Sequence, residues 1–321
     1  MLAYIVRRIG YGLLVVLGVL TLLYVLFFLI TEPEDIARKA LGEKAPPAAI
    51  EQWTKNHGYD RPLAPGPGHW VDNLFVDHFR RMLTFDFGRS DSDNSPILER
   101  VKEGMGPSLS LTVPLFVMGL LLEIALALFV ALFRETYIDR MGVFLCVLGM
   151  SVSILLYIIG GQYLIGKSLR WFPISGFDPS PAVIARFLML PIIVNLLHAL
   201  VSQVRFYRTV FVEEIHKDYV RTARAKGAGD GRVMFHHVLR NAMIPILTTV
   251  VMSIPFLFTG ALLTEAFFGI PGLGSLTVDA ILGNDFATLR TMVYIGSLLF
   301  ILGQILTDIS YSIADPRVRL E

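Results

Sequence analysis

Few side chains in this sequence are arranged for catalysis. The 321 residues include one cysteine, Cys146, which lies in an apolar run and has no partner for an internal disulfide. His236 and His237 are adjacent, so a helix would point them to different sides and they make a poor metal site. The sequence has no Ser/His/Asp or Cys/His arrangement and no glycine-rich phosphate loop that ends in Lys-Ser or Lys-Thr. We therefore predict no catalytic residue, no bound metal or cofactor, and no ATPase site in this chain.

Two carboxylates stand within or beside apolar runs, Glu123 and Asp308. A carboxylate in hydrocarbon costs roughly 2.5–3.5 kcal/mol on insertion scales, so such residues face a bundle interior or water. Glu123 could line a pathway, join helices by pairing with Asn195, His198 or Gln203, or lie near the cytoplasmic interface. These alternatives stay open, whereas for Asp308 we favour a position near the cytoplasmic interface.

Glu123 and Asp308 lie within or beside long apolar runs of the sequence. The chain is 54% hydrophobic and only 17% charged, whereas soluble domains are about 25% charged. A bilayer core about 30 Å thick takes roughly 20 apolar helical residues, and irregular backbone cannot face lipid unsatisfied. We therefore predict an all-α integral membrane protein with six transmembrane helices. Six runs have about this length: Ile9–Ile30, Ser108–Phe133, Met141–Gly166, Phe187–Val204, Asn241–Thr264 and Thr291–Thr307.

Lysines and arginines predict the orientation of these helices. Cytoplasmic loops carry an excess of positive charge. Arg7 and Arg8 precede the first run, Arg134 and Arg140 separate the second from the third, and eight basic residues lie within 205–240. Both termini are therefore expected to be cytoplasmic. The net charge of +1 gives no indication of a nucleic-acid partner.

The runs divide the chain into three parts. These are the tail and first helix, 1–30, an external segment, 31–107, and a core, 108–321, which includes a cytoplasmic loop at 205–241. In the external segment we expect a short helix at Ala48–His57 and a stretch along the membrane surface at Arg80–Gly88, where apolar and charged residues mix. Turn-forming prolines and glycines, such as Pro65-Gly66-Pro67-Gly68, separate such pieces. The segment should form a compact cap over the outer mouth.

The cytoplasmic loop contains the most informative stretch. Good helix formers dominate Val212–Gly227, and Gly227 stands where a helix would end. Ile215, Tyr219 and either Thr222 or Ala223 recur at the spacing of three and four residues that one helix face requires.

Two further features of this loop suggest how it is used. The small side chains of Ala223 and Ala225 keep the surface low, so another protein could approach closely. Asp230 is expected to cap a second helix that runs from Gly231 to Asn241 and leads into the fifth span.

This loop resembles the cytoplasmic signature of the dipeptide/oligopeptide-type permeases of ABC importers. The matching stretches are Asp218–Gly227, with Ala223 and Gly227 at the signature's alanine and glycine, and His237–Pro245. The similarity extends over almost the whole chain. It also includes Asp86–Ser90, Asp139–Arg140, Trp171–Gly176, Glu265–Gly274 and Asp315–Arg317.

The resemblance implies a transport subunit of a bacterial inner membrane. It would form half of a pathway, with a second homologous permease as the other half. Two ATPase subunits, which use ATP and Mg²⁺, would drive it, and an external solute-binding protein would deliver the solute. Peptides are the expected cargo, with nickel chelates, sugars and antimicrobial peptides as alternatives. The resemblance assigns the coupling to the ATPase subunits to seven residues: Asp218, Tyr219, Arg221, Ala223, Arg224, Lys226 and Gly227.

Three positions depart from the family's pattern. Ser151–Tyr157 lacks the proline of a Ser-x-Pro-x-Phe element, Ser253–Phe256 stands where glycines are common, and Glu123 stands where a small residue is usual. We expect the pathway or its gate to include five residues: Glu123, Ser153, Ser253, Phe256 and Glu265.

Other classes of function fit the sequence less well. The basic loop could simply contact anionic membrane lipid, which would explain its charges but not its Ala-x-x-x-Gly core. A membrane enzyme would need clustered nucleophile and base residues. An ion-coupled carrier would typically have inverted repeats and broken helices at matched positions.

Overall fold

The structure is a computed structural model that describes residues 2–31, 33–42, 44–66 and 70–314, and every regular element in these ranges is a helix. The C-terminal motif Asp315–Arg317 and part of the expected turn at residues 65–68 lie outside the described residues. Four helices are long and apolar enough to cross a membrane. They are α1 (Leu2–Tyr24) with its π-helical continuation η1 (Val25–Ile30), α5 (Ile97–Leu132), α8 (Ile184–Ile215) and α15 (Phe286–Ala314).

Two further spans contain bends. The third span is α6 (Tyr137–Met150) followed by α7 (Ile154–Gly161) and η2 (Gln162–Ser168), with a bend of 92° between them. The fifth is α12 (Met243–Thr259), which follows a cytoplasmic segment at an angle of 56°. That segment consists of α10 (Asp230–Arg232), η3 (Val233–Val238) and α11 (Leu239–Asn241).

A third bent pair does not cross the membrane by itself. It comprises α13 (Leu262–Phe268) and α14 (Leu273–Leu282), which meet at 84°. At 1.5 Å per residue these helices are only about 10 Å and 15 Å long, well short of the roughly 30 Å bilayer core. They therefore form a re-entrant hairpin, and the six-span fold expected from the sequence is confirmed.

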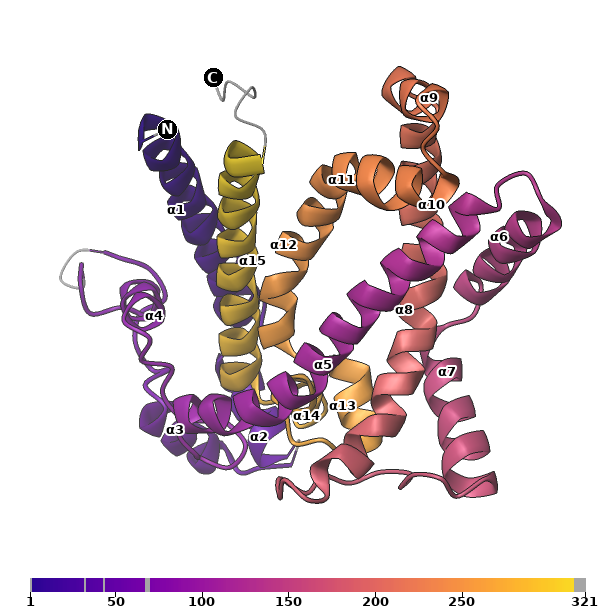
Figure 1. Cartoon of the computed structure of the whole chain (residues 1–321). Coiled ribbons are helices and arrows are strands. Elements are labelled where there is room, and N and C mark those ends of the chain that lie inside the picture. The colour runs from indigo at the N-terminus through magenta and orange to yellow at the C-terminus, as the bar shows by residue number, and fades with distance from the viewer. Residues whose placement is uncertain (1, 32, 43, 67–69, 315–321) are drawn as a thin grey trace.

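The ends of the molecule agree with the orientation deduced from the charges. Figure 1 shows the start of α1 and the end of α15 at the same end of the molecule as α9 (Asp218–Ala225) and α11. The hairpin of α13 and α14 lies at the opposite, outer end.

The third span differs most from its expectation. The sequence predicts one continuous helix through Met141–Gly166, but the chain breaks at residues 151–153 without any proline there. Close packing on α8 accompanies the break, since a Cβ on Gly149 would lie 2.6 Å from Val201 Cγ1. Ser153 caps the new helix by accepting a hydrogen bond from the backbone N–H of Leu155.

Two spans are longer than the apolar runs that predicted them. With 36 and 32 residues, α5 and α8 extend about 54 Å and 48 Å. They exceed the bilayer core, so α5 continues outward past residue 107 and α8 continues inward to Ile215. The fifth span, by contrast, ends early at Thr259, and Thr264 belongs to α13.

The external segment packs on the outer ends of the first and sixth spans. Its helices are α2 (Pro33–Leu41), α3 (Pro47–Asn56) and α4 (Leu74–Leu83). The helix expected at residues 48–57 is therefore present, shifted by one residue. The surface stretch expected at residues 80–88 is partly wrong, because Met82 and Phe87 are buried in a cluster with both spans.

The crossing of α12 and α15 depends on a glycine. A Cβ on Gly303 would lie 2.2 Å from Cγ of Pro255, whose ring cannot rotate aside, whereas a Cβ on Gly296 would lie 3.8 Å from Thr259 Cγ2. Overpacking of this kind costs about 1–3 kcal/mol. We expect Gly303→Ala to lower the thermal unfolding temperature of the purified protein by several degrees, while Gly296→Ala leaves it unchanged. Equal unfolding temperatures for the two variants would contradict this packing.

Candidate functional site

The cytoplasmic helix is a separate element, α9 (Asp218–Ala225). The sequence predicted one helix face running from Ile215 through Tyr219, but α8 ends at Ile215 and α9 starts anew after a break. Asp218 in the first turn and Arg224 in the last complement the helix dipole. The helix ends where expected, with Gly227 at φ +86°, a left-handed conformation that glycine adopts without strain.

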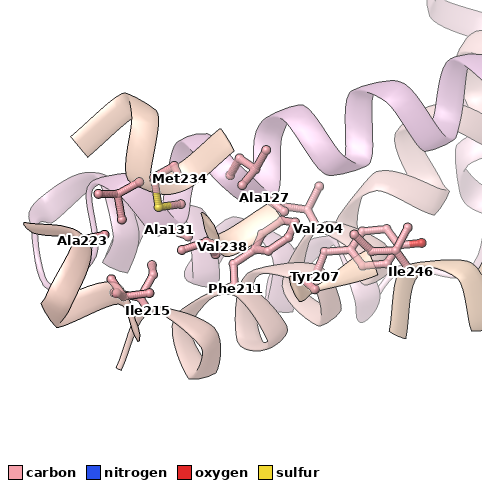
Figure 2. Close-up of a cluster of buried hydrophobic side chains, with 14 of the residues drawn as sticks. Ala127, Ala131, Val204, Tyr207, Phe211, Ile215, Ala223, Met234, Val238 and Ile246 are labelled. Atoms are coloured by element: carbon pink, nitrogen blue, oxygen red, sulfur yellow. The ribbon is translucent and has the colours of Figure 1, made fainter. Parts of the chain in front are cut away.

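The inner face of α9 packs on its own chain. Val220 and Ala223 are buried in one cluster with Met234 and Val238 of η3. Ala223 is 7% exposed, and its small side chain lets α9 lie close to η3. It also lines an open pocket with Tyr219 and Gly227, so the close approach of another protein at Ala223 stays a prediction. Figure 2 shows this cluster, with Ala223 and Ile215 at one end and Tyr207 and Ile246 at the other.

Tyr219 ties α9 to the end of α8. Its hydroxyl donates a hydrogen bond of 2.5 Å to Oε2 of Glu214. Burial of the ring edge, and then this hydrogen bond to a carboxylate, raise the pKa of Tyr219 above its ordinary value. Tyr219 therefore helps to position α9, and, being half-buried, it also lines the open pocket beside Ala223 and Gly227.

The outer face of α9 is charged and exposed. It presents Asp218, Arg221, Arg224 and Lys226. Arg224 Nη2 lies 3.2 Å from Oδ1 of Asp230. The expected cap is thus wrong, because Gly229 occupies the N-cap position of α10 and Asp230 pairs with α9 instead.

A cavity of about 280 Å³ lies among α5, α8 and α12. It brings together three of the five residues expected in the pathway, Glu123, Ser253 and Phe256. Glu123 is only 8% exposed. Within the described part of the chain, its carboxylate makes no hydrogen bond or ion pair.

None of the three residues considered as partners makes a hydrogen bond or an ion pair with Glu123. The side chain of Asn195 donates to the carbonyl of Pro191 at 2.7 Å and accepts from Thr264 Oγ1 at 3.0 Å. The ring of His198 packs edge-on against Tyr157. The third, Gln203, lines the same cavity as Glu123 without bonding to it.

Glu265 lies elsewhere and has a different task. It is fully buried in α13, where Oε1 accepts from Ser108 Oγ and Ala261 N, both at 2.9 Å. Its Oε2 accepts from Gly274 N at 2.7 Å and Ser275 N at 3.2 Å. Glu265 therefore fastens the re-entrant hairpin to α5 rather than lining the cavity. The fifth expected residue, Ser153, sits at the helix break and also lies outside the lining.

Sequence comparison agrees with this architecture. The profile of the family described as binding-protein-dependent transport system inner membrane component matches residues 107–320, and its N-terminal companion matches residues 1–112. A protein of Brucella abortus named as a peptide transport system permease is 33% identical over 325 residues, which cover 100% of both chains. The glutathione transport system permease protein of Pectobacterium atrosepticum is 32% identical over 321 residues, which cover 99% of both chains.

The chain belongs to the binding-protein-dependent transport permeases. It is therefore a multi-pass subunit of an ABC transporter in the bacterial inner membrane, a transport subunit rather than an enzyme. The family also implies ATPase and solute-binding-protein partners. A more distant relative, the dipeptide transport system permease protein of Alkalihalophilus pseudofirmus, is 28% identical over 342 residues and covers 99% of this chain and 100% of that protein.

In this permease, the end of the external motif Asp86–Ser90 is held to the start of the sixth span by hydrogen bonds to Asp285. Asp285 is buried just before α15, where it accepts hydrogen bonds from Thr288 N at 3.0 Å and Thr288 Oγ1 at 2.6 Å. It also accepts from Ser90 Oγ at 2.6 Å and Asp91 N at 3.1 Å. One carboxylate thus caps the sixth span and anchors the external loop to it.

Ion pairs join the permease helices at the cytoplasmic side. Arg8 of α1 pairs with Asp308 of α15, which agrees with an interfacial position for Asp308. Arg208 of α8 donates two hydrogen bonds to Asp139, at 2.5 Å and 2.6 Å. The Asp139–Arg140 motif therefore helps to fix the first cytoplasmic loop.

Our reading of the sequence missed part of the cavity. Tyr207 and Thr249 line it and were not expected there, and Gln203 was considered only as a partner of Glu123. A signal was present in the spacing, since Gln203 and Tyr207 are four residues apart, as are Thr249 and Ser253, so each pair shares a helix face.

Proposed function

We propose that this permease forms half of the translocation pathway of a peptide importer and is driven through α9. The main support is one continuous apolar cluster, which contains Val220 and Ala223 of α9, Tyr207 of the cavity and Ile246 of α12. A displacement of α9 would be transmitted to the cavity walls, because packed interiors resist compression.

The exposed outer face of α9 is the surface that we assign to an ATPase subunit. Arg221, Arg224 and Lys226 are exposed and do not belong to the apolar cluster that contains Val220 and Ala223. Arg224 lies at the edge of this surface, beside its partner Asp230. Two ATPase subunits would use ATP and Mg²⁺, and each would engage the α9 of one permease.

A second homologous permease would complete the pathway. Phe256 lines the cavity and is nonetheless 54% exposed, so the cavity lacks a wall on that side. The exposed leucines and phenylalanines on the outer helix faces would contact membrane lipid. In this proposal the external segment, 31–107, contacts the solute-binding protein together with 171–176 and 269–274.

Peptides are the cargo class that the comparisons favour. Relatives that match nearly the whole chain are named as permeases for peptides, dipeptides and glutathione. Nickel chelates, sugars and antimicrobial peptides are the alternatives that a transport assay with the reconstituted complex would distinguish. ATP turnover stimulated by one of these and by none of a panel of peptides would refute the peptide assignment.

Docking through α9 predicts that a bulky residue on its outer face releases the ATPase. Ala225 is exposed beside the buried Ala223, so Ala225→Trp obstructs the outer face without disturbing the core. We expect the tagged variant to recover less than a tenth of the ATPase that the wild type co-purifies. Thr136→Trp, at an exposed position of the other cytoplasmic loop, should recover the normal amount. Undiminished recovery with Ala225→Trp would contradict docking at this face.

A further inference from the structure

We infer that the cavity among α5, α8 and α12 holds a primary ammonium group of the cargo against the carboxylate of Glu123. The inference rests on the proposed function, because it assumes that cargo passes through this cavity. It adds a substrate class, since peptides with a free N-terminus carry such a group.

Glu123 gives the cavity its charge. Among the described residues that line it, Glu123 is the one charged side chain, and no lysine, arginine or histidine faces it. As a residue Glu123 is 8% exposed, and its carboxylate makes no hydrogen bond or ion pair in the described part of the chain. A buried carboxylate is expensive unless a cation or several hydrogen-bond donors accompany it. The cavity therefore contains a hydrogen-bond acceptor, the carboxylate of Glu123, that a ligand with donors could bind.

The hydroxyl groups of Tyr207 and Thr249 also face the cavity as acceptors. Thr249 Oγ1 donates its hydrogen to the carbonyl of Ile246 at 2.8 Å. The hydrogen bond of 2.7 Å between Tyr207 and Thr249 must then be donated by Tyr207. Both hydroxyl hydrogens are thus committed inside the protein, and lone pairs are left for the cavity.

The remaining two hydroxyls behave in the same way. Ser253 Oγ donates to the carbonyl of Thr249 at 2.7 Å. Thr112 Oγ1 donates to the carbonyl of Leu257 at 2.8 Å. Apart from the side-chain amide of Gln203, which has both donors and an acceptor, every polar side chain in the lining offers acceptors.

An ammonium group matches this lining better than other ligands. It carries three N–H donors and no acceptor. A cargo carboxylate would face Glu123 and acceptor lone pairs, with repulsion from both. A metal ion would need more anionic or imidazole ligands, and the described residues contain no group of three or more that could hold one.

The charge of the cavity can be tested without knowing the cargo. Ser253→Cys in a Cys146→Ser background places a thiol in the cavity of the purified complex. We expect a trimethylammonium methanethiosulfonate to react faster than its sulfonate counterpart, and Glu123→Gln to lower this ratio of rates about tenfold, the effect of ~1.4 kcal/mol. Glu103→Gln, at an exposed position of the same helix, should keep the ratio. An unchanged ratio with Glu123→Gln would overturn the inference.

A second assay connects this charge to cargo. Proteoliposomes with the complete transporter are given alanyl-phenylalanine or its N-acetyl form, and the two uptake rates are expressed as a ratio. Since the same binding protein serves the wild type and Glu123→Gln, its own selectivity cancels when the ratios are compared. We expect the ratio to fall about tenfold in Glu123→Gln. If it does not change, the ammonium site is refuted and peptide transport stands. If the wild type imports neither peptide, the cargo proposal fails, and the thiol ratio still decides the charge of the cavity.

Discussion

Replacement of Gly227 by valine should reduce cargo-stimulated ATP turnover of the reconstituted transporter at least tenfold. Gly227 has a φ of +86°, where a β-branched residue is strained by about 1–3 kcal/mol. The strain would be relieved by unwinding the end of α9 or by tilting it away from η3. Either change removes the surface that we assign to the ATPase, so ATPase recovery should fall together with turnover.

Gly229 provides a matched control two residues away. Its φ of −67° and ψ of 155° are open to any residue. A Cβ at either glycine would meet nothing within 4 Å, so the two positions differ in backbone conformation and not in space. Gly229→Val should therefore retain most of the turnover. If both variants lost ATP turnover equally, the left-handed conformation at Gly227 would not be what turnover requires.

Replacement of Glu265 by alanine should prevent stable assembly of the permease. The substitution leaves three backbone N–H groups and the hydroxyl of Ser108 without their buried acceptor. Each buried group left unsatisfied costs about 1–3 kcal/mol. We expect the variant to lose most of its folded yield in a size-exclusion profile and to unfold at a markedly lower temperature.

Asp279 tests whether this effect belongs to the buried carboxylate. It lies on α14 of the same hairpin but is exposed. Asp279→Ala should give the yield and unfolding temperature of the wild type. A normal yield for Glu265→Ala would mean that other contacts hold the hairpin on α5.

The membrane helices could be predicted from the sequence because each apolar run, as a helix, is about as long as the bilayer core is thick. Their ends were less predictable. Outside the bilayer, polar residues do not interrupt a helix, so α5 begins at Ile97 and α8 continues to Ile215. The break at residues 151–153 could not be predicted, because no proline marks it in the sequence. It accompanies the close contact between Gly149 and Val201, which only the tertiary structure shows.

Side-chain roles were harder to predict than helices. The sequence indicated a helix that ends at Gly227, but not the face that Ala223 would occupy, because the break before Asp218 resets the helical phase. It also grouped Glu123 and Glu265 as pathway residues. Both are buried carboxylates, and only the tertiary structure separates a saturated one from one without partners.

Cross-linking from the outer face of α9 tests the central claim most directly. In a Cys146→Ser background, Arg221→Cys in the intact complex would be labelled with a maleimide–benzophenone reagent, whose second group inserts into nearby C–H bonds on illumination. We predict a covalent adduct between this permease and an ATPase subunit, identified by mass spectrometry. A thiol at the external Asp93 should give no such adduct. Labelling of Arg221→Cys from the outer side of the membrane, or the absence of any ATPase adduct in a complex that turns over ATP, would contradict the account.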